Sequence, residues 1–367
     1  MKKEKLVNLV RMIACSIVAF SGLLTHAAAE IVITPRITGL DAPWGMAHLP
    51  DGSVLITEKE GKVLLWRDGQ TRTVTGAPAV VDSGQGGLLD ITAARDFETT
   101  RTVWLTYSKR QQGGAGTALA AAELSSDGTQ LQNVRDLFVM APGSSGGRHF
   151  GSRVVEARDG TLFVTIGDRG DRPEAQNRDN HVGTIVRVNR DGSVPADNPF
   201  IGQAGVQPEI WSYGHRNPQG AGLDASGQLW TAEHGARGGD EVNRIKKGAN
   251  FGWPVISYGR HYSGAAIGQG TEQAGMEQPA MYWDPSMAPS GLLVYTGDMF
   301  PQWRGNIFVG SLKFDYISRI EVSGEKAREV AQISNSATER VRDIAQAPDG
   351  SIWFISVGNG TVYEMRQ

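Results

Sequence analysis

One turn-and-strand unit recurs along the chain and limits its fold more than any other feature. Complete copies span Pro50–Ile56, Arg158–Val164 and Pro348–Phe354, and degenerate copies begin near residues 101, 227 and 305. Each copy is a glycine-containing or polar turn followed by an apolar strand, as in a β-hairpin. The six copies are spaced 45 to 78 residues apart, which leaves room for four strands in each interval.

The composition agrees with a fold rich in turns and strands. Glycine accounts for 47 of the 367 residues, without a collagen period, and 40% of the chain is hydrophobic. Period-two alternation predicts strands at residues 53–58, 62–66, 102–106 and 161–166. We therefore predict an all-β fold, a single six-bladed β-propeller of four-stranded antiparallel blades over residues 30–367. A large β-sandwich or two β domains are the alternatives, although no linker or charge run marks a boundary.

The first 29 residues have the pattern of a signal peptide. Four basic residues precede the apolar run Met12–Leu24, and Ala27-Ala28-Ala29 follows it. A membrane anchor would need about 20 apolar residues. We expect cleavage after Ala29, a mature chain without a membrane span, and a periplasmic or secreted protein. Cleavage would remove Cys15, the only cysteine, so stability would rest on packing rather than disulfides.

Several loop segments contain more charged and amide side chains than a turn requires. The formal net charge of −3 gives no basic field for nucleic acid. Spacing alone suggests a cationic, glycine-lined pocket on a propeller, while a structural loop histidine and solvated arginines are the plain alternatives. No zinc, phosphate-loop or nucleophile-elbow pattern is present in the sequence. The segments are Gly146–Arg153, Trp211–Gly220, Glu233–Glu241, Gly248–Pro254, Ser311–Lys313 and Glu339–Asp343.

Together these segments resemble the soluble quinoprotein aldose sugar dehydrogenases of the glucose/sorbosone dehydrogenase family. The matching motifs occur in family order from about residue 35 to the C-terminus. The resemblance implies a six-bladed propeller that uses pyrroloquinoline quinone (PQQ) and Ca²⁺. The motifs are Gln85–Asp90, Gly147–Arg153, Gly214–Gly220, Gly239–Asn243, Asn250–Pro254, Ser311–Lys313 and Arg340–Asp343.

The resemblance also implies which residues hold the cofactor. PQQ has three carboxylates, and fixed cations suit them. By resemblance, Lys313, Arg340 and Arg342 hold the cofactor, while Arg216 and Asn217 lie beside the quinone oxygens.

The same resemblance assigns the metal ligands. The backbone carbonyls of Gly235 and Ala236 match the pair that holds the catalytic calcium, although the family commonly has proline at the second position. Glu241 and the Phe251 carbonyl resemble ligands of a second, structural calcium. Oxygen donors of this kind are what calcium prefers.

His149 matches the general base that takes the proton of the anomeric hydroxyl. Arg216 also matches a catalytic position, where it polarises the quinone, and Gln85 and Asp168 match positions on the substrate side. Arg148 stands where some glucose-oxidising relatives have Asp, and the loop at residues 259–289 also differs, so we expect a broad aldose range.

The resemblance implies oxidation of aldoses to lactones, with electrons passing to an external acceptor such as a periplasmic cytochrome or quinone. A propeller lactone hydrolase is one alternative. It would leave the basic residues of the site without a role: Arg216, Lys313, Arg340 and Arg342. A non-enzymatic binding propeller is the other, and it would have no need of His149 beside these cations.

Overall fold

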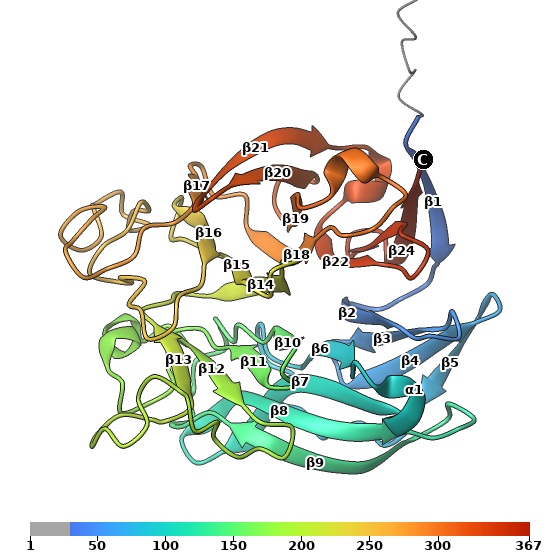
Figure 1. Ribbon diagram of the computed structural model, residues 1–367, viewed down its shortest axis with the longest axis horizontal. Coiled ribbons are helices and arrows are strands. Elements are labelled where there is room, and N and C mark those ends of the chain that lie inside the picture. The colour runs from blue at the N-terminus through green and yellow to red at the C-terminus, as the bar shows by residue number, and fades with distance from the viewer. Residues whose placement is uncertain (1–29) are drawn as a thin grey trace, which may run out of the picture. The chain divides into compact units, whose positions relative to one another are not determined.

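The computed structural model describes residues 30–367, and their regular secondary structure is almost entirely β-strand. Twenty-four strands build six four-stranded antiparallel sheets. Figure 1 shows these sheets arranged as blades around a centre, so the predicted six-bladed propeller is confirmed. The predicted signal peptide, residues 1–29, lies outside the described residues.

Each blade is one sheet. Blade 1 contains β2 (Pro43–His48), β3 (Val54–Glu58), β4 (Lys62–Arg67) and β5 (Gln70–Val74). Blade 2 contains β6 (Leu88–Ala93), β7 (Thr102–Gln111), β8 (Gly114–Leu124) and β9 (Leu131–Val139). Blade 3 contains β10 (Val154–Glu156), β11 (Leu162–Thr165), β12 (Thr184–Val188) and β13 (Ile210–Tyr213).

The second half of the chain repeats this plan. Blade 4 contains β14 (Pro218–Leu223), β15 (Leu229–Glu233), β16 (Asp240–Arg244) and β17 (Met281–Trp283). Blade 5 contains β18 (Pro289–Val294), β19 (Ile307–Ser311), β20 (Ile317–Ser323) and β21 (Lys326–Ile333). Blade 6 contains β22 (Val341–Gln346), β23 (Ile352–Ser356), β24 (Thr361–Arg366) and, from the other end of the chain, β1 (Val32–Ile37).

The ring is closed by both ends of the chain. Strand β1 pairs antiparallel with β24, in a register that joins Val32 to Arg366 and Ile37 to Val362. The first strands of neighbouring blades contact one another around the ring, and β2 completes it against β22. The sequence predicted closure, but it did not reveal that blade 6 is shared between the two ends.

The recurring turn-and-strand unit is the entry to the second strand of each blade. Its six copies lead into β3, β7, β11, β15, β19 and β23. The aspartates of the complete copies fix the turns, because the Asp51 carboxylate accepts the Ser53 N–H at 3.0 Å, and Asp159 and Asp349 do the same two residues onward. Such Asx turns set the chain direction before a strand.

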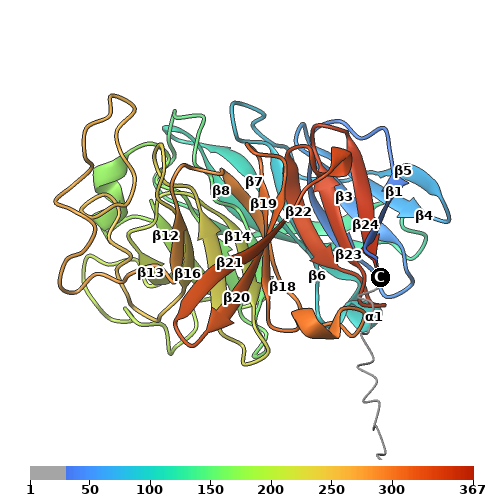
Figure 2. The ribbon, with the colours of Figure 1, turned by 90° about the horizontal axis from the view of Figure 1, so that it is seen from above.

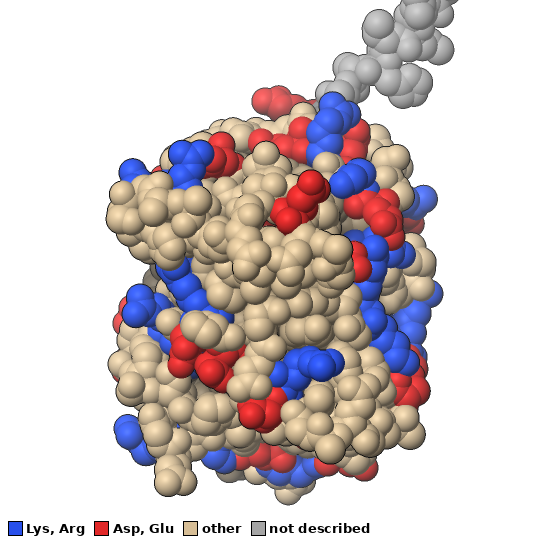
Figure 3. All heavy atoms as spheres, turned by 90° about the vertical axis from the view of Figure 1, so that its left-hand side faces the viewer, with Lys and Arg blue, Asp and Glu red and all other residues tan. Residues whose placement is uncertain are grey.

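Apolar side chains pack between neighbouring blades. Leu55 and Leu65 of blade 1, for example, share a cluster with Val103 and Leu105 of blade 2, and all four are fully buried. Helix is limited to short connections: α1 (Phe97–Thr100), η1 (Arg172–Gln176), η2 (Pro301–Trp303) and η3 (Ser336–Thr338). Within residues 30–367, no helix has the length and apolar character to cross a membrane. Figure 3 shows acidic and basic side chains interspersed over one side.

The antiparallel pairing brings distant loops to one face of the ring. In each blade the start of the first strand lies opposite the end of the second, as Pro218 opposite Glu233, and Pro289 opposite Ser311. Figure 2 shows the strands crossing the thickness of the ring, with loops on both faces. The loops that enter first strands and leave second strands therefore meet on the same face, and they carry most of the residues singled out from the sequence.

Candidate active site

A cavity of about 650 Å³ opens on this face. Residues from blades 1, 2, 4, 5 and 6 line it, either on first strands or in the loops just described. Its walls combine aromatic, amide and basic side chains: Trp44, Lys59, Gly84, Gln85, Gln219, His234, Ala288, Leu312, Lys313, Asp315, Glu339, Arg340 and Arg342. The three cations assigned from the sequence to a cofactor, Lys313, Arg340 and Arg342, thus share one cavity.

Lys313, Arg340 and Arg342 form the cationic wall of this cavity. Hydrogen bonds hold its two arginines. Arg340 donates from Nη1 to the Leu312 carbonyl at 2.9 Å, and Arg342 donates from Nη1 to the Gln219 side-chain oxygen at 2.8 Å. Burial, with the charges of Arg153 and Arg340, lowers the pKa of Arg342 to about 9. The guanidinium stays charged at neutral pH, in a place that favours an anion.

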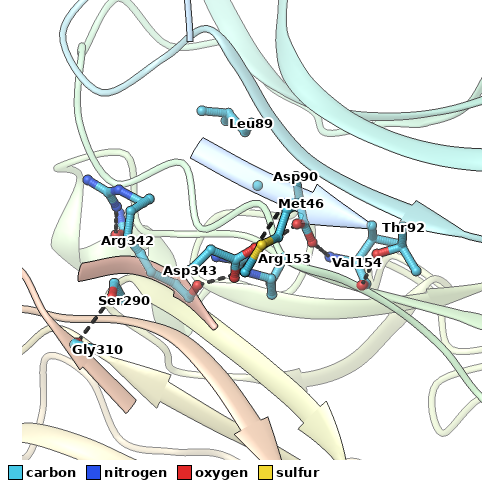
Figure 4. Close-up of polar contacts among 12 residues, drawn as sticks. Met46, Leu89, Asp90, Thr92, Arg153, Val154, Ser290, Gly310, Arg342 and Asp343 are labelled. Carbon is cyan, nitrogen blue, oxygen red and sulfur yellow. Dashed lines mark hydrogen bonds and ion pairs between the residues drawn. The ribbon is translucent and has the colours of Figure 1, made fainter. Parts of the chain in front are cut away.

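A buried ion cluster supports this wall (Figure 4). Arg153 Nη1 lies 2.7 Å from Asp90 Oδ1 and 2.8 Å from Asp343 Oδ1, and all three residues are at most 5% exposed. The Arg153 guanidinium also lies 4.5 Å from the centre of the Trp44 ring. The cluster joins blades 1, 2, 3 and 6, and it includes the residue next to Arg342.

His149 is paired with a buried carboxylate. Its Nδ1 lies 2.5 Å from Asp168 Oδ1, while Trp253 Nε1 donates to Asp168 Oδ2 at 2.8 Å. Burial raises the pKa of Asp168, but the bond to His149 and nearby positive charge outweigh it and keep that pKa below its usual value. The resemblance placed Asp168 on the substrate side. The structure instead buries it completely beneath His149, where it fixes the imidazole's orientation.

The His149 side chain is 12% exposed, and burial lowers its pKa, partly offset by the bond to Asp168. Its backbone N–H donates to the Gln85 side-chain oxygen at 2.6 Å. Gln85 in turn lines the main cavity. With Nδ1 engaged by Asp168, Nε2 is the nitrogen of His149 that remains for proton transfer.

Arg216 and Asn217 immediately precede β14 and lie against the His149 loop. Asn217 accepts the Gly151 N–H at 3.1 Å through its side-chain oxygen, and Arg216 accepts the Asp168 N–H at 2.8 Å through its carbonyl. Within residues 30–367, Arg216 Nε and Asn217 Nδ2 are buried and have no hydrogen-bond partner. Buried donors normally find acceptors, so this pair fits a ligand with acceptor oxygens, such as a quinone.

The residues assigned to metal binding separate into carbonyl and carboxylate donors. Gly235, Glu241 and Phe251 line a narrow cavity of about 20 Å³ next to Arg216. Burial and the charge of Glu233 raise the pKa of Glu241 to about 8. A bound cation would stabilise the ionised carboxylate and lower this pKa. The Ala236 carbonyl accepts the Arg260 N–H at 2.8 Å, which leaves one of its two lone pairs.

Side-chain ligands alone do not make a metal centre here. Over residues 30–367, no group of three or more His, Cys, Asp or Glu side chains could hold a metal ion. A calcium would therefore depend on backbone carbonyls, on the cofactor and on water, as the resemblance implies. The donor set is all oxygen, which suits calcium rather than a transition metal.

Three contributors to the site received no role from the sequence. Trp253 lies within a quoted motif, but its bond to Asp168 spans 85 residues and has no local signal. His234 directly precedes Gly235 and Ala236, whose carbonyls were assigned to calcium, and it lines both cavities. Lys59, the first residue after β3, adds a fourth cation to the main cavity.

Comparison with known proteins decides the family. The sequence model described as glucose/sorbosone dehydrogenase matches residues 40–364. The chain belongs to this family. It is 41% identical over 347 residues to aldose sugar dehydrogenase YliI of Escherichia coli, covering 93% of this chain and 94% of that protein. It is 25% identical to quinoprotein glucose dehydrogenase B of Acinetobacter calcoaceticus, covering 97% and 93% of the two chains.

Solved structures of family members have the same fold. The apo form of the soluble aldose sugar dehydrogenase from Escherichia coli superimposes with a TM-score of 0.88 at 40% identity, covering 92% of this chain and 99% of that one. The PQQ-bound aldose sugar dehydrogenase from Streptomyces coelicolor superimposes with a TM-score of 0.77 at 25% identity, covering 92% and 98%. The chain is thus similar throughout to sugar-oxidising enzymes, which supports an oxidoreductase.

Proposed function

We propose that this chain is a PQQ- and calcium-dependent aldose 1-dehydrogenase. The observation that carries the proposal is the placement of the His149–Asp168 pair against the donors Arg216 Nε and Asn217 Nδ2. The pair is joined through Gln85 to the cavity with the cationic wall. A base, two donors for acceptor oxygens and cations for carboxylates are what oxidation of a sugar hydroxyl by an anionic quinone needs. The PQQ-bound family member supports the choice of cofactor.

The residues present fit the two groups. Arg342, Arg340 and Lys313 would take the carboxylates, and Arg216 with Asn217 would take the quinone oxygens. Carbonyls of Gly235 and Ala236 would hold the calcium beside them. When bound, PQQ supplies an ortho-quinone that accepts two electrons as a hydride, and calcium polarises it.

The chain's own residues perform the proton chemistry. His149 Nε2 takes the proton of the anomeric hydroxyl, and Asp168 stabilises the imidazolium that results, as in other carboxylate–histidine pairs. Gln85 positions the His149 backbone through the 2.6 Å bond. The product is a lactone, because the anomeric carbon loses its hydrogen while the hydroxyl loses its proton.

The two alternative functions use these residues less well. A metal-dependent lactone hydrolase would need a cluster of metal-binding side chains, and residues 30–367 contain no such group of three or more His, Cys, Asp or Glu. A binding protein would have no use for a neutral imidazole held by a buried carboxylate. Neither alternative accounts for buried, unsatisfied donors at Arg216 and Asn217.

Reconstitution tests the proposal. Purified protein should bind PQQ in the presence of Ca²⁺, as followed by its absorbance spectrum, and then reduce an artificial acceptor dye when an aldose is added. Lactone should accumulate in step with dye reduction. Absence of both PQQ binding and dye reduction would overturn the proposal, whereas lactone hydrolysis without PQQ would favour the hydrolase.

We also propose that the chain is exported and that its mature form begins at Glu30. The basic, apolar and small-residue regions of the first 29 residues support this. The acceptor of its electrons would then be a periplasmic cytochrome or quinone. Amino-terminal sequencing of the exported protein tests the cleavage site, and recovery of Met1 in the membrane fraction would count against it.

A further inference from the structure

Two arginines near the base have no task in the proposed chemistry. Arg148 directly precedes His149 and is exposed, while the half-buried Arg172 begins η1, four residues after Asp168. Of the ion pairs formed within residues 30–367, none includes Arg148, Arg172 or the exposed Asp171. Both arginines therefore have a positive charge that no carboxylate of these residues neutralises.

Trp253 places Arg172 next to the His149–Asp168 pair. The Arg172 guanidinium lies 5.2 Å from the centre of the Trp253 ring, and that of Arg216 lies 5.4 Å from it. The indole N–H of Trp253 donates to Asp168. Arg172 donates from Nη1 to His261 Nδ1 at 2.9 Å, and its Nη2 and Nε form no hydrogen bond within residues 30–367. These two nitrogens are free to bind a ligand.

Arg148 lies over the segment that joins Asp168 to Arg172. A Cβ atom at Gly170 would lie 2.7 Å from Arg148 Nε, so the guanidinium packs against this glycine. The Gly170 N–H in turn donates to Asp168 Oδ1 at 2.7 Å. The pKa of His149 agrees with this placement: burial lowers it most, and the charges of Arg216 and Arg148 lower it further. Arg148 and Arg172 thus both lie close to the His149–Asp168 pair.

The proposed cofactor does not account for these two cations. Its carboxylates already have Lys313, Arg340 and Arg342, which line the main cavity, whereas Arg148 and Arg172 do not line it. The substrate of His149 is the remaining candidate. A neutral sugar would leave both charges without a counterion, while a carboxylate or a phosphate fits the fork of a guanidinium.

We propose that the preferred substrates are aldoses with an anionic group, a carboxylate or a phosphate, away from the anomeric carbon, and that Arg172 and Arg148 bind this group. The inference rests on the proposed function and leaves its chemistry unchanged. The anomeric hydrogen leaves as a hydride to the cofactor, the hydroxyl proton goes to His149 Nε2, and the anionic group does not react. The two arginines act by orienting the sugar toward the base.

Three sugars that differ only at C6 test this in the wild-type protein. Glucose, glucuronate and glucose 6-phosphate have the same ring stereochemistry, and kcat/KM is measured for each with the reconstituted enzyme. We expect glucuronate or glucose 6-phosphate to exceed glucose by about tenfold at low ionic strength, and added salt to reduce the difference. The better of the two identifies the anionic group as carboxylate or phosphate. Equal kcat/KM for all three would overturn the inference, whereas no turnover of any aldose would overturn the proposed function.

Variants locate the binding group. Arg172→Gln and Arg148→Gln should each lower the ratio of kcat/KM for the anionic sugar to that for glucose by about 3- to 10-fold, and Arg172→Lys, which keeps the charge, should lower it less. Arg178→Gln is a matched control. Arg178 is also half-buried, lies 5.0 Å from the centre of an aromatic ring, that of Phe200, and is in no ion pair of residues 30–367. The ratio should stay at its wild-type value in this control, and an unchanged ratio in both Arg172→Gln and Arg148→Gln would overturn the assignment.

Equilibrium binding tests the contact without turnover. Methyl glucuronide has a blocked anomeric oxygen and cannot be oxidised to a lactone, so it can be titrated into the PQQ- and Ca²⁺-loaded protein. Tryptophan fluorescence follows binding, since Arg172 lies against Trp253. Wild type should bind methyl glucuronide more tightly than methyl glucoside, and the Kd of methyl glucuronide should rise about 3- to 10-fold in Arg172→Gln. If the variants instead slow only reoxidation by an anionic acceptor such as ferricyanide, the arginines serve the acceptor and the inference is overturned.

Discussion

His149 Nδ1 lies 2.5 Å from Asp168 Oδ1, and the other oxygen of that carboxylate accepts a 2.8 Å bond from Trp253 Nε1. The three side chains come from the loop before β10, the loop after β11 and the long loop after β16. A base on a loop is thus held by two other segments of the chain. This arrangement engages Nδ1 and leaves Nε2 for proton transfer, and fixed orientation is what a general base requires.

Replacing Asp168 by Asn should slow the reduction of bound cofactor by aldose, on the order of 10²-fold. The amide keeps the shape but loses the charge that stabilises the imidazolium, and it can select the wrong tautomer. PQQ affinity should be unchanged, because the cationic wall is intact. Stopped-flow absorbance of the reconstituted enzyme measures the step, with the exposed Asp191→Asn as control. A wild-type rate in Asp168→Asn would mean that the pair is structural.

His149 also sets the pH dependence of this step. Burial lowers the pKa of His149 from its ordinary 6.5, so the imidazole is neutral and competent at pH 7. The rate should fall only as the pH drops through that lowered pKa. The bond to Asp168 raises the His149 pKa. Its loss in Asp168→Asn should therefore move the fall in rate at acid pH, the acid limb of the pH–rate profile, to still lower pH.

Removing the base should abolish that limb. His149→Gln should bind PQQ normally and lose about 10²- to 10⁴-fold in the reductive step, with no acid limb, while reoxidation by dye is unaffected. The same stopped-flow series, run from pH 4 to 8, measures both effects. An acid limb that survives in His149→Gln would assign the proton to another group.

The fold was predictable because its signal is local and repeated. Each turn before an apolar strand encodes its own hairpin, and six copies, such as those at Gly52 and Gly350, reveal the number of blades. The pairing of β1 with β24 left no such signal. Strand pairing between chain ends depends on ring geometry, since Val32–Ile37 reads only as one more short strand.

The site was predictable in composition and less so in arrangement. The motifs placed Lys313, Arg340 and Arg342 together, and they do line one cavity. They did not show that Asp168 turns inward to His149, because burial at that position depends on Trp253, 85 residues further along the chain. Side-chain contacts between distant segments depend on how the whole chain packs, and a short sequence motif does not encode them.

The cationic wall should decide cofactor affinity. Truncating Arg342 to Ala removes a charge-assisted contact worth about 1.5–3 kcal/mol, which corresponds to roughly a 10- to 100-fold rise in the Kd for PQQ. Arg328→Ala, at a side chain 77% exposed on blade 5, should leave the Kd unchanged. Fluorescence titration with Ca²⁺ present measures both. An unaltered Kd in Arg342→Ala would remove the wall from the cofactor site.

The ion cluster beneath that wall should matter for stability more than for chemistry. In Arg153→Met the carboxylates of Asp90 and Asp343 would face each other without their shared cation. Breaking a buried pair in this way costs about 3–5 kcal/mol. Guanidinium denaturation should therefore give a lower midpoint for Arg153→Met than for wild type.

The loss of stability in Arg153→Met should be larger at high pH than at low pH. Burial already raises the pKa of Asp343 to about 6 and raises that of Asp90, and removal of Arg153 should raise both further. A carboxyl whose pKa is higher folded than unfolded stabilises the fold at low pH and loses that contribution as the pH rises through its folded pKa. Arg153→Met should accordingly be closer to wild type at pH 5 than at pH 8. Adding Asp90→Asn and Asp343→Asn should remove the pH dependence and recover stability, because no buried charge remains. Equal midpoints for Arg153→Met and wild type at pH 8 would show that Arg153 does not hold these carboxylates together.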